Sequence, residues 1–216
     1  MDEHVKPSRP YRSQLRAEQA RETRTRISDA ARALFLERGF AATTIAAVAE
    51  QAGVAPETVY AVYRSKAGLL EGVVRSAVFR DGEPDEALQA GWVKELLRLP
   101  DLPTQITALA RHTAQTVALT SPIYATMTGA GTSASELDEL QRQLRKLRFS
   151  SQAAVIHAIA TEQTLRPGLT IEEAADTFSA LASPELHHIL TTDRGWSQDR
   201  YARWLEQTTK AALLPD

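Results

Sequence analysis

Two short helical segments that meet at Gly53 constrain the fold of this chain more than any other feature of its sequence. Apolar residues recur at helical spacing up to this glycine and again after Pro56, a residue well suited to the first turn of a helix. Thr43 and Thr44 offer the first segment an N-cap, and Gly53 accepts the positive φ of a tight turn. Each segment spans about two turns. Their inward positions are Ile45, Val48, Ala49, Ala52, Val59, Val62 and Tyr63.

The spacing of three of these residues predicts a helix-turn-helix. Two helices that cross closely need a small side chain at the contact, which Ala49 supplies. Gly53 follows four residues later, and Val59, six beyond it, is a branched side chain that can hold the second helix against the first. An unrelated helical hairpin could produce the same spacing by chance, so the wider sequence has to decide.

Helical periodicity continues on both sides of this motif, and no strand-like alternation persists. A helix carrying Ile27, Ala30, Ala31, Leu34 and Phe35 ends at Arg38-Gly39, and another runs from about Lys66 to the Asp81-Gly82 break. Further helices are predicted over residues 85–99, 104–120, 123–128, 136–164, 170–182, a short one from 184, and 197–214. Capping boxes are expected at Ser133/Glu136 and Thr170/Glu173, and Leu137, Leu140, Leu144 and Leu147 share one face. The fold class is all-α.

Several classes of protein are excluded or disfavoured by what the sequence lacks. It has no cysteine, which excludes disulfides, thiolate catalysis and cysteine-ligated zinc. It has no His-x-x-x-His pair, and His187 and His188 are adjacent, so they diverge on a helix. It also has no glycine-rich phosphate loop and no Gly-x-Ser-x-Gly elbow. We therefore expect no enzyme, metal or cofactor, and with no secretory signal or membrane span in sight, a cytoplasmic protein.

Charge is distributed unevenly along the chain. Residues 1–80 hold 13 Lys and Arg against 9 Asp and Glu, whereas residues 81–216 hold 12 against 18. The excess begins in a basic N-terminal arm, residues 1–20, with Lys6, Arg9, Arg12 and Arg16. A basic arm suggests a polyanionic partner, and it could reach the minor groove of DNA. The alternative is a solvated leader without a function.

The segment from Arg24 to Leu70 resembles the DNA-binding domain of the tetracycline-repressor (TetR) family. The resemblance rests on Arg24, Arg26, Ile27, Ala30, Ala31, Phe35, Gly39, Phe40, Thr43, Thr44, Ile45, Ala49, Ala52, Gly53, Val54, Thr58, Val59, Tyr60, Tyr63, Ser65, Lys66, Leu69 and Leu70. It implies an all-α homodimer with a DNA-binding domain over 21–66, whose motif covers about 44–63. A helical regulatory and dimerisation domain would then occupy 67–216.

The sequence departs from the family pattern at two positions of the second motif helix. Ala55 stands where the family commonly has a serine that caps the helix and touches a phosphate, so that contact is absent. Glu57 stands where the family commonly has a glycine that allows close approach to DNA. A carboxylate there could accept a hydrogen bond from cytosine N4, or it could simply lie favourably at a helix N-terminus.

Helical geometry assigns the outward positions of this helix to a DNA surface. With Val59, Val62 and Tyr63 inward, the outward residues are Pro56, Glu57, Thr58, Tyr60, Ala61 and Arg64. Thr58 could bind a base edge or a phosphate, and the Ala61 methyl could meet a thymine methyl. The resemblance implies phosphate contacts for Tyr60 and Lys66, and Thr43 or Thr44 could offer a hydroxyl and backbone N–H groups to another phosphate. Alternatively, the threonines are only caps and Lys66 only a surface charge.

The predicted function is that of a transcriptional regulator that binds double-stranded DNA. We expect a homodimeric repressor of a palindromic operator, released by a small organic effector, with residues 170–182 and 197–214 as the dimer surface. Those helices could instead pack only within one chain. Residues that could line an effector pocket are Trp92, His112, Thr116, Tyr124, Met127 and His157. The alternatives are a helical protein-binding adaptor and an all-α enzyme that uses its histidines.

Overall fold

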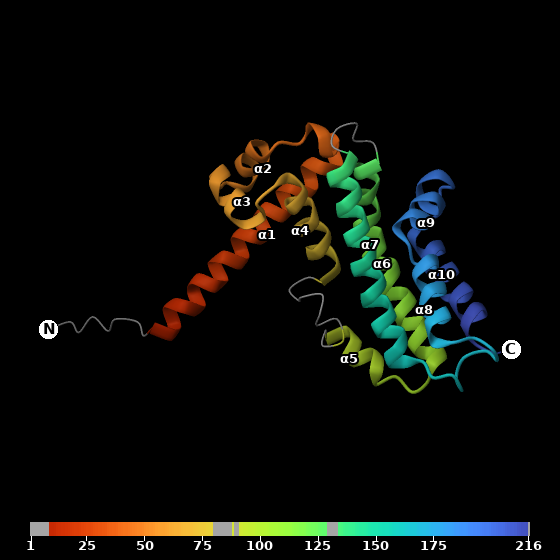
Figure 1. Ribbon diagram of the computed structural model, residues 1–216. Helices are drawn as coiled ribbons and strands as arrows, with labels where there is room; N and C mark the ends of the chain where they lie inside the picture. Colours follow the sequence, from red (N-terminus) through yellow and green to blue (C-terminus); the bar gives the residue numbers. More distant parts are fainter. Residues whose placement is uncertain (1–8, 80–87, 89–90, 129–133, 216) are drawn as a thin grey trace.

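The computed structural model describes residues 9–79, 88, 91–128 and 134–215. The regular elements over these residues are helical, as predicted (Figure 1). In chain order they are α1 (Arg9–Ala42), α2 (Ile45–Ala52), α3 (Pro56–Tyr63), α4 (Lys66–Phe79), α5 (Gly91–Leu97), α6 (Leu102–Thr128), α7 (Ala134–Ile159), α8 (Ile171–Leu181), α9 (Pro184–His188), the π-helical turn η2 (Ile189–Asp193) and α10 (Gln198–Leu213).

The first helix is longer than its apolar pattern indicates. It begins at Arg9, so the described part of the expected N-terminal arm is helical, and residues 1–8 lie outside the described part of the chain. Residues 15–20 are exposed, and Figure 1 shows this end of α1 extending away from the other helices. At the other end, Gly39 leaves the helical conformation with φ 75° and ψ 171°, at the break that the sequence predicts.

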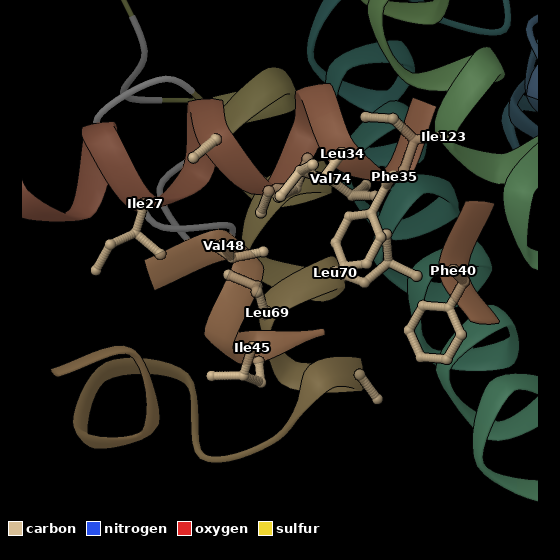
Figure 2. Packing of buried hydrophobic residues seen from close by; sticks show 14 of the residues in the cluster. Ile27, Leu34, Phe35, Phe40, Ile45, Val48, Leu69, Leu70, Val74 and Ile123 are labelled. Carbon is tan, nitrogen blue, oxygen red and sulfur yellow. The ribbon is translucent and has the colours of Figure 1, made fainter. Parts of the chain in front are cut away.

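Helices α1 to α4 pack together around a first hydrophobic core. Ile27, Leu34 and Phe35 from α1 pack with residues of α2 and α4, and all three are buried. The same core also takes in Ile123 and Met127 of α6 and Leu137, Leu140 and Leu144 of α7. Figure 2 shows Ile123 lying among residues of this core. The unit of α1 to α4 is therefore packed directly against α6 and α7.

A second core joins α5, α6, α7, α8 and α10. Its largest buried side chains include Phe178 of α8 and Tyr201 and Leu205 of α10. Helix α6 contributes its first half to this core and its last turns to the first core, and α7 does the same in the opposite order along the chain. Each of these two helices therefore packs in both cores.

Two predicted features of the later helices are wrong. The predicted break between residues 120 and 123 is wrong, because α6 continues through Pro122, where Ser121 donates a hydrogen bond to the Pro184 carbonyl oxygen at 3.0 Å. The predicted end of the long helix at 164 is also wrong, since α7 ends at Ile159. There Thr164 Oγ1 accepts from the Thr161 N–H at 3.0 Å, and this local turn competes with a further helical turn.

The remaining helix ends follow the local chemistry of the sequence. Thr170 and Glu173 form the expected capping box at α8, and Ser197 caps α10 by accepting a hydrogen bond from the Arg200 N–H. Of the helix predicted over 85–99, the structure describes α5, while residues 85–87 and 89–90 lie outside the described residues. The capping box expected at Ser133 and Glu136 involves side chains that the structure does not describe.

Candidate DNA-binding surface

The turn between α2 and α3 is built as the sequence predicts. Thr44 is the N-cap of α2, where its side-chain oxygen accepts from the Ala47 N–H at 3.1 Å. Gly53 closes the helix in the left-handed conformation, with φ 65° and ψ 42°, and its N–H donates to the Ala49 and Glu50 carbonyl oxygens. A side chain at this φ would be strained, so glycine is required here. The turn therefore sets the direction in which α3 leaves α2.

Helix α3 is held by one face and presents the other to solvent. On its inner face Val59 is fully buried, while Val62 and Tyr63 are half-buried. Tyr60 keeps 53% of its surface exposed. The other outward positions, Pro56, Glu57, Ala61 and Arg64, are exposed and Thr58 is half-buried. The six residues predicted to face DNA therefore lie around one side of the helix.

Both ends of α3 carry a distinctive feature. At the N-terminus Ala55 gives no side-chain cap, and Glu57 lies in the first turn, where the positive end of the helix dipole stabilises a carboxylate. At the C-terminus Arg64 adopts φ 62°, uncommon for a residue with a side chain, and its N–H donates to the Tyr60 carbonyl oxygen at 2.9 Å. Among the described residues it is the one non-glycine residue with positive φ.

Thr43 faces the interior, in contrast to its predicted place at the DNA surface. Only 1% of its surface is exposed, and its hydroxyl donates to the Gly39 carbonyl oxygen at 2.8 Å and lies 3.1 Å from that of Leu34. The hydroxyl thereby bonds carbonyl groups near the end of α1, close to the break at Gly39. Of the two threonines, Thr44 is therefore the exposed one that can meet a phosphate.

Lys66 also plays a different part from the predicted backbone contact. Its ammonium lies within 2.8 Å of the Phe40 carbonyl oxygen, 3.2 Å of that of Ala41 and 3.1 Å of that of Thr43. It also lies over the Phe40 ring, 4.5 Å from its centroid. An ammonium has three N–H donors, and these carbonyl oxygens account for them. In this structure Lys66 ties the end of α1 and the adjoining Thr43 to the start of α4.

Sequence reasoning missed the contact by which α3 rests on α4. A Cβ on Gly68 would lie 2.2 Å from the Tyr63 carbonyl oxygen, and one on Gly72 would lie 2.3 Å from the ring atom Cε1 of Tyr63. The Tyr63 hydroxyl donates to the Arg24 carbonyl oxygen of α1 at 3.4 Å, and burial raises the pKa of this phenol. Two glycines one turn apart inside a helical pattern are the signal that could have revealed this close approach.

The residues predicted to line an effector pocket fall into separate places. Trp92 of α5 stacks on His112 of α6 with ring centroids 3.8 Å apart, and Thr116 donates to the His112 carbonyl oxygen at 3.1 Å. Tyr124 and Met127, further along α6, pack with the first core, where burial raises the pKa of Tyr124 to about 12. His157 is exposed on α7. The structure thus brings three of the six together.

The expected dimer helices are each half-covered by their own chain. Phe178 of α8 and Tyr201, Leu205 and Leu213 of α10 are buried in the second core. Their opposite faces are exposed, with Glu172 and Asp176 on α8 and Arg203 on α10. These outer faces are the surfaces available to a second copy of the chain.

Over the described residues, no group of three or more His, Cys, Asp or Glu side chains is arranged to hold a metal ion. None of the described helices combines the length and apolarity needed to cross a membrane.

Comparison with known proteins agrees with the geometry of α1 to α4. Residues 27–73 match the family model of bacterial regulatory proteins of the tetR family. The uncharacterized HTH-type transcriptional regulator YvkB of Bacillus subtilis is 33% identical over 79 residues, which are 37% of this chain and 42% of YvkB. The matched region thus spans less than half the length of this curated relative.

The likeness of fold extends over nearly the whole chain. The crystal structure of NalD, the secondary repressor of the MexAB-OprM multidrug efflux pump of Pseudomonas aeruginosa, has a TM-score of 0.65 and 23% identity, covering 91% of this chain and 98% of NalD. The complex of triclosan with SmeT, the repressor of the multidrug efflux pump SmeDEF of Stenotrophomonas maltophilia, has a TM-score of 0.64 and 22% identity, covering 90% and 92%. At these identities the similarity concerns the fold.

Proposed function

Because this chain belongs to the TetR family of bacterial regulators, we propose that it is a homodimeric transcriptional repressor that binds a palindromic operator and is released by a small organic molecule. The observation that carries the proposal is the presentation of α3. Val59 is buried on one side of this helix, and the opposite side and the adjoining Arg64 expose hydroxyl, carboxylate and guanidinium groups. An exposed helix of this kind fits the major groove of B-DNA.

The exposed groups divide into those that position the protein and those that read bases. Tyr60 and the N-cap residue Thr44 offer hydroxyl groups to phosphates, which fix the register of the protein on DNA. Glu57, Thr58 and Ala61 lie in the first turns of α3, where side chains reach base edges. Pro56 and Arg64 flank them at the two ends of the helix. Exposed arginines of α1, including Arg16, Arg21 and Arg24, add positive charge beside this surface.

Useful specificity requires two copies of this short helix. A symmetric dimer presents two recognition helices about 34 Å apart, or a multiple of this distance, to two halves of a palindrome. We assign the dimer contact to the outer faces of α8 and α10. A chromosomal operator implies a cytoplasmic protein.

Release by an effector has a structural route through α6 and α7. Both helices pack in the core of the DNA-binding unit and in the core of the second half. A molecule that binds the second half with different affinities in two dimer states shifts the balance between them, and hence the separation of the recognition helices. SmeT, which shares the fold, is known in complex with triclosan, which supports a small organic effector here.

The proposal is tested by introducing a negative charge on the face of α3 that we assign to DNA. An operator is first selected from a random DNA pool, and its affinity is measured by fluorescence anisotropy. Ala61→Asp should weaken operator binding at least about 100-fold, because its carboxylate faces the acidic groove without disturbing the buried side of α3. Ala158→Asp, with the same change in charge at an exposed position of α7, is the matched control and should bind like the wild type. Equal affinities for both variants would contradict the proposal.

A salt titration separates this function from that of a protein-binding adaptor. Binding to DNA releases counterions, so the logarithm of the affinity should fall steeply and linearly with the logarithm of the salt concentration. An adaptor that pairs through apolar helices would show little dependence on salt and no enriched DNA sequence.

A further inference from the structure

The buried face of α7 is apolar at both ends and polar in the middle. Leu137, Leu140 and Leu144 lie in the first core, and Val155, Ile156 and Ile159 lie in the second. Between them, Arg148, Ser151 and Gln152 follow at helical spacing, so they share one side of α7. The polar stretch therefore coincides with the boundary between the two cores.

Three atoms of this stretch are buried without a hydrogen-bonding partner. They are Arg148 Nε, Ser151 Oγ and Gln152 Oε1. Arg148 Nε is a donor, Gln152 Oε1 is an acceptor, and the Ser151 hydroxyl can act as either. A buried polar atom without a partner lowers stability, and three on one helical face are seldom tolerated without a role. Their arrangement suits a molecule that offers both acceptors and a donor.

The charges around this stretch leave a positive excess. Glu185 pairs with Arg145 at 3.3 Å and with Arg148 at 3.4 Å, so two guanidinium groups face one carboxylate. Two phenols complete the surroundings, Tyr124 of α6 and Tyr201 of α10. The charge of Arg148 acts on both hydroxyls and opposes the rise in pKa that burial causes. One further negative charge would balance the two arginines and Glu185.

We propose that the polar stretch of α7 is the effector site and that it takes a small hydroxylated organic carboxylate. The carboxylate accepts hydrogen bonds from Arg148 Nε and from the Ser151 hydroxyl, while a hydroxyl of the ligand donates to Gln152 Oε1. This inference rests on the proposed function and names its ligand class. It shares only Tyr124 with the pocket that the sequence predicts.

The position of the site on α7 explains how a bound ligand can affect the DNA-binding unit. Leu144, one turn before Arg148, packs in the core of that unit. Ser121 joins α6 to α9 through its hydrogen bond to the Pro184 carbonyl oxygen. Glu185 joins α9 to α7 through its ion pairs with Arg145 and Arg148. An anion that draws Arg148 and Ser151 together changes the packing where α6 and α7 pass from one core to the other.

The first experiment compares carboxylates with neutral molecules of the same shape. A set of mono- and dihydroxybenzoates, each paired with its benzamide, is titrated into the full chain by isothermal calorimetry. At least one benzoate should bind about tenfold more tightly than its amide, because charge-assisted hydrogen bonds to arginine are stronger than neutral ones. Arg148→Met should remove this difference. Failure of every benzoate to bind, or equal affinity of each pair, would overturn the proposal.

The second experiment tests whether the polar atoms are unpaired in the free protein. The double variant Ser151→Ala, Gln152→Met should melt about 2–4 °C higher than the wild type, since unpaired buried atoms are removed, and should lose benzoate affinity. Ser150→Ala, which changes an exposed neighbour on α7, is the control and should alter neither quantity. A double variant that melts lower than the wild type would show that the free protein already pairs these atoms, and the inference fails.

Operator binding is measured separately, so the two proposals can fail independently. A chain that binds no DNA in the absence of benzoate overturns the proposed function, whereas calorimetry still reports on the site in α7. A benzoate that binds and lowers operator affinity at least about tenfold supports both proposals. A benzoate that binds without changing operator affinity removes the effector role from this site.

Discussion

Replacing Gly68 with alanine tests how closely α3, the helix that we propose contacts DNA, is held against α4. The new Cβ would lie 2.2 Å from the Tyr63 carbonyl oxygen, about 1 Å inside the ~3.3 Å of the shortest ordinary C–H···O contacts. The contact is with backbone at the last residue of α3, so a side-chain rotation cannot relieve it. Overpacking of this kind costs about 1–3 kcal/mol, and alanine recovers up to about 1 kcal/mol through its helix propensity. We expect a net loss of about 1–2 kcal/mol.

This loss converts into a measurable shift. For a chain of this length it lowers the melting temperature by about 2–8 °C, which circular dichroism detects. Operator affinity should fall at least about tenfold, because α3 has to move away from α4 to relieve the contact. Gly91→Ala is the control, since no heavy atom lies within 4 Å of a Cβ there, and it should not lower the melting temperature. A Gly68→Ala protein that melts and binds like the wild type would refute the reasoning.

Four further predictions follow from single side chains or segments. Lys66→Met should lower the free energy of unfolding in urea by about 1–3 kcal/mol, because carbonyl oxygens lose their donor. It should leave the salt dependence of DNA binding unchanged. A reduced salt dependence would show that Lys66 contacts DNA. Tyr60→Phe should weaken binding about equally on operator and unrelated DNA without changing the melting temperature, and a marked drop in that temperature would show that the hydroxyl is structural. Burial lowers the pKa of His187 from 6.5, so the unfolded chain takes up a proton at a higher pH than the folded chain does. The free energy of unfolding should therefore decrease below about pH 6.5, and it should decrease less in His187→Gln. Identical pH profiles of the two proteins would contradict this. Deleting residues 1–20 should reduce DNA affinity at low salt while the fold persists, and equal affinities would make this segment a leader without a function.

The helix-turn-helix could be predicted because local chemistry marks each of its boundaries. Thr44 caps α2, Gly53 ends it with a positive φ, and Pro56 starts α3. The burial of Val59 follows from helical spacing alone. Such features depend on residues a few positions apart, which is the range that sequence patterns describe well.

The roles of Thr43 and Lys66 could not be predicted in the same way. The partners of the Lys66 ammonium lie 23 to 26 residues earlier in the chain, and only the packing of α4 against the end of α1 brings them within reach. A lysine at the start of a helix has the same sequence pattern whether it meets a phosphate or a carbonyl oxygen. Likewise, both threonines suit an N-cap, and the break at Gly39 decides which one turns inward.

The candidate effector site could be predicted from the sequence only in part. The change from leucines to Arg148, Ser151 and Gln152 on one face of α7 is visible in the sequence, and so is the return to apolar residues at Val155. Whether these polar atoms are buried and unpaired depends on the helices around them, which periodicity does not place. The predicted effector pocket rested on the types of single residues, such as His112 and Tyr124, which are a weaker guide than a change in pattern along one helical face.

The central claim, that α3 reads the bases of a palindrome, is tested most directly by selecting DNA from a random pool with two forms of the full chain. One form is the wild type, and the other carries Glu57→Gln and Thr58→Ala on the groove-facing turn of α3. The account predicts that the wild type enriches a palindrome and that the variant enriches a sequence altered at one symmetric pair of positions. Enrichment of the same sequence by both forms, or of no palindrome by the wild type, would contradict it.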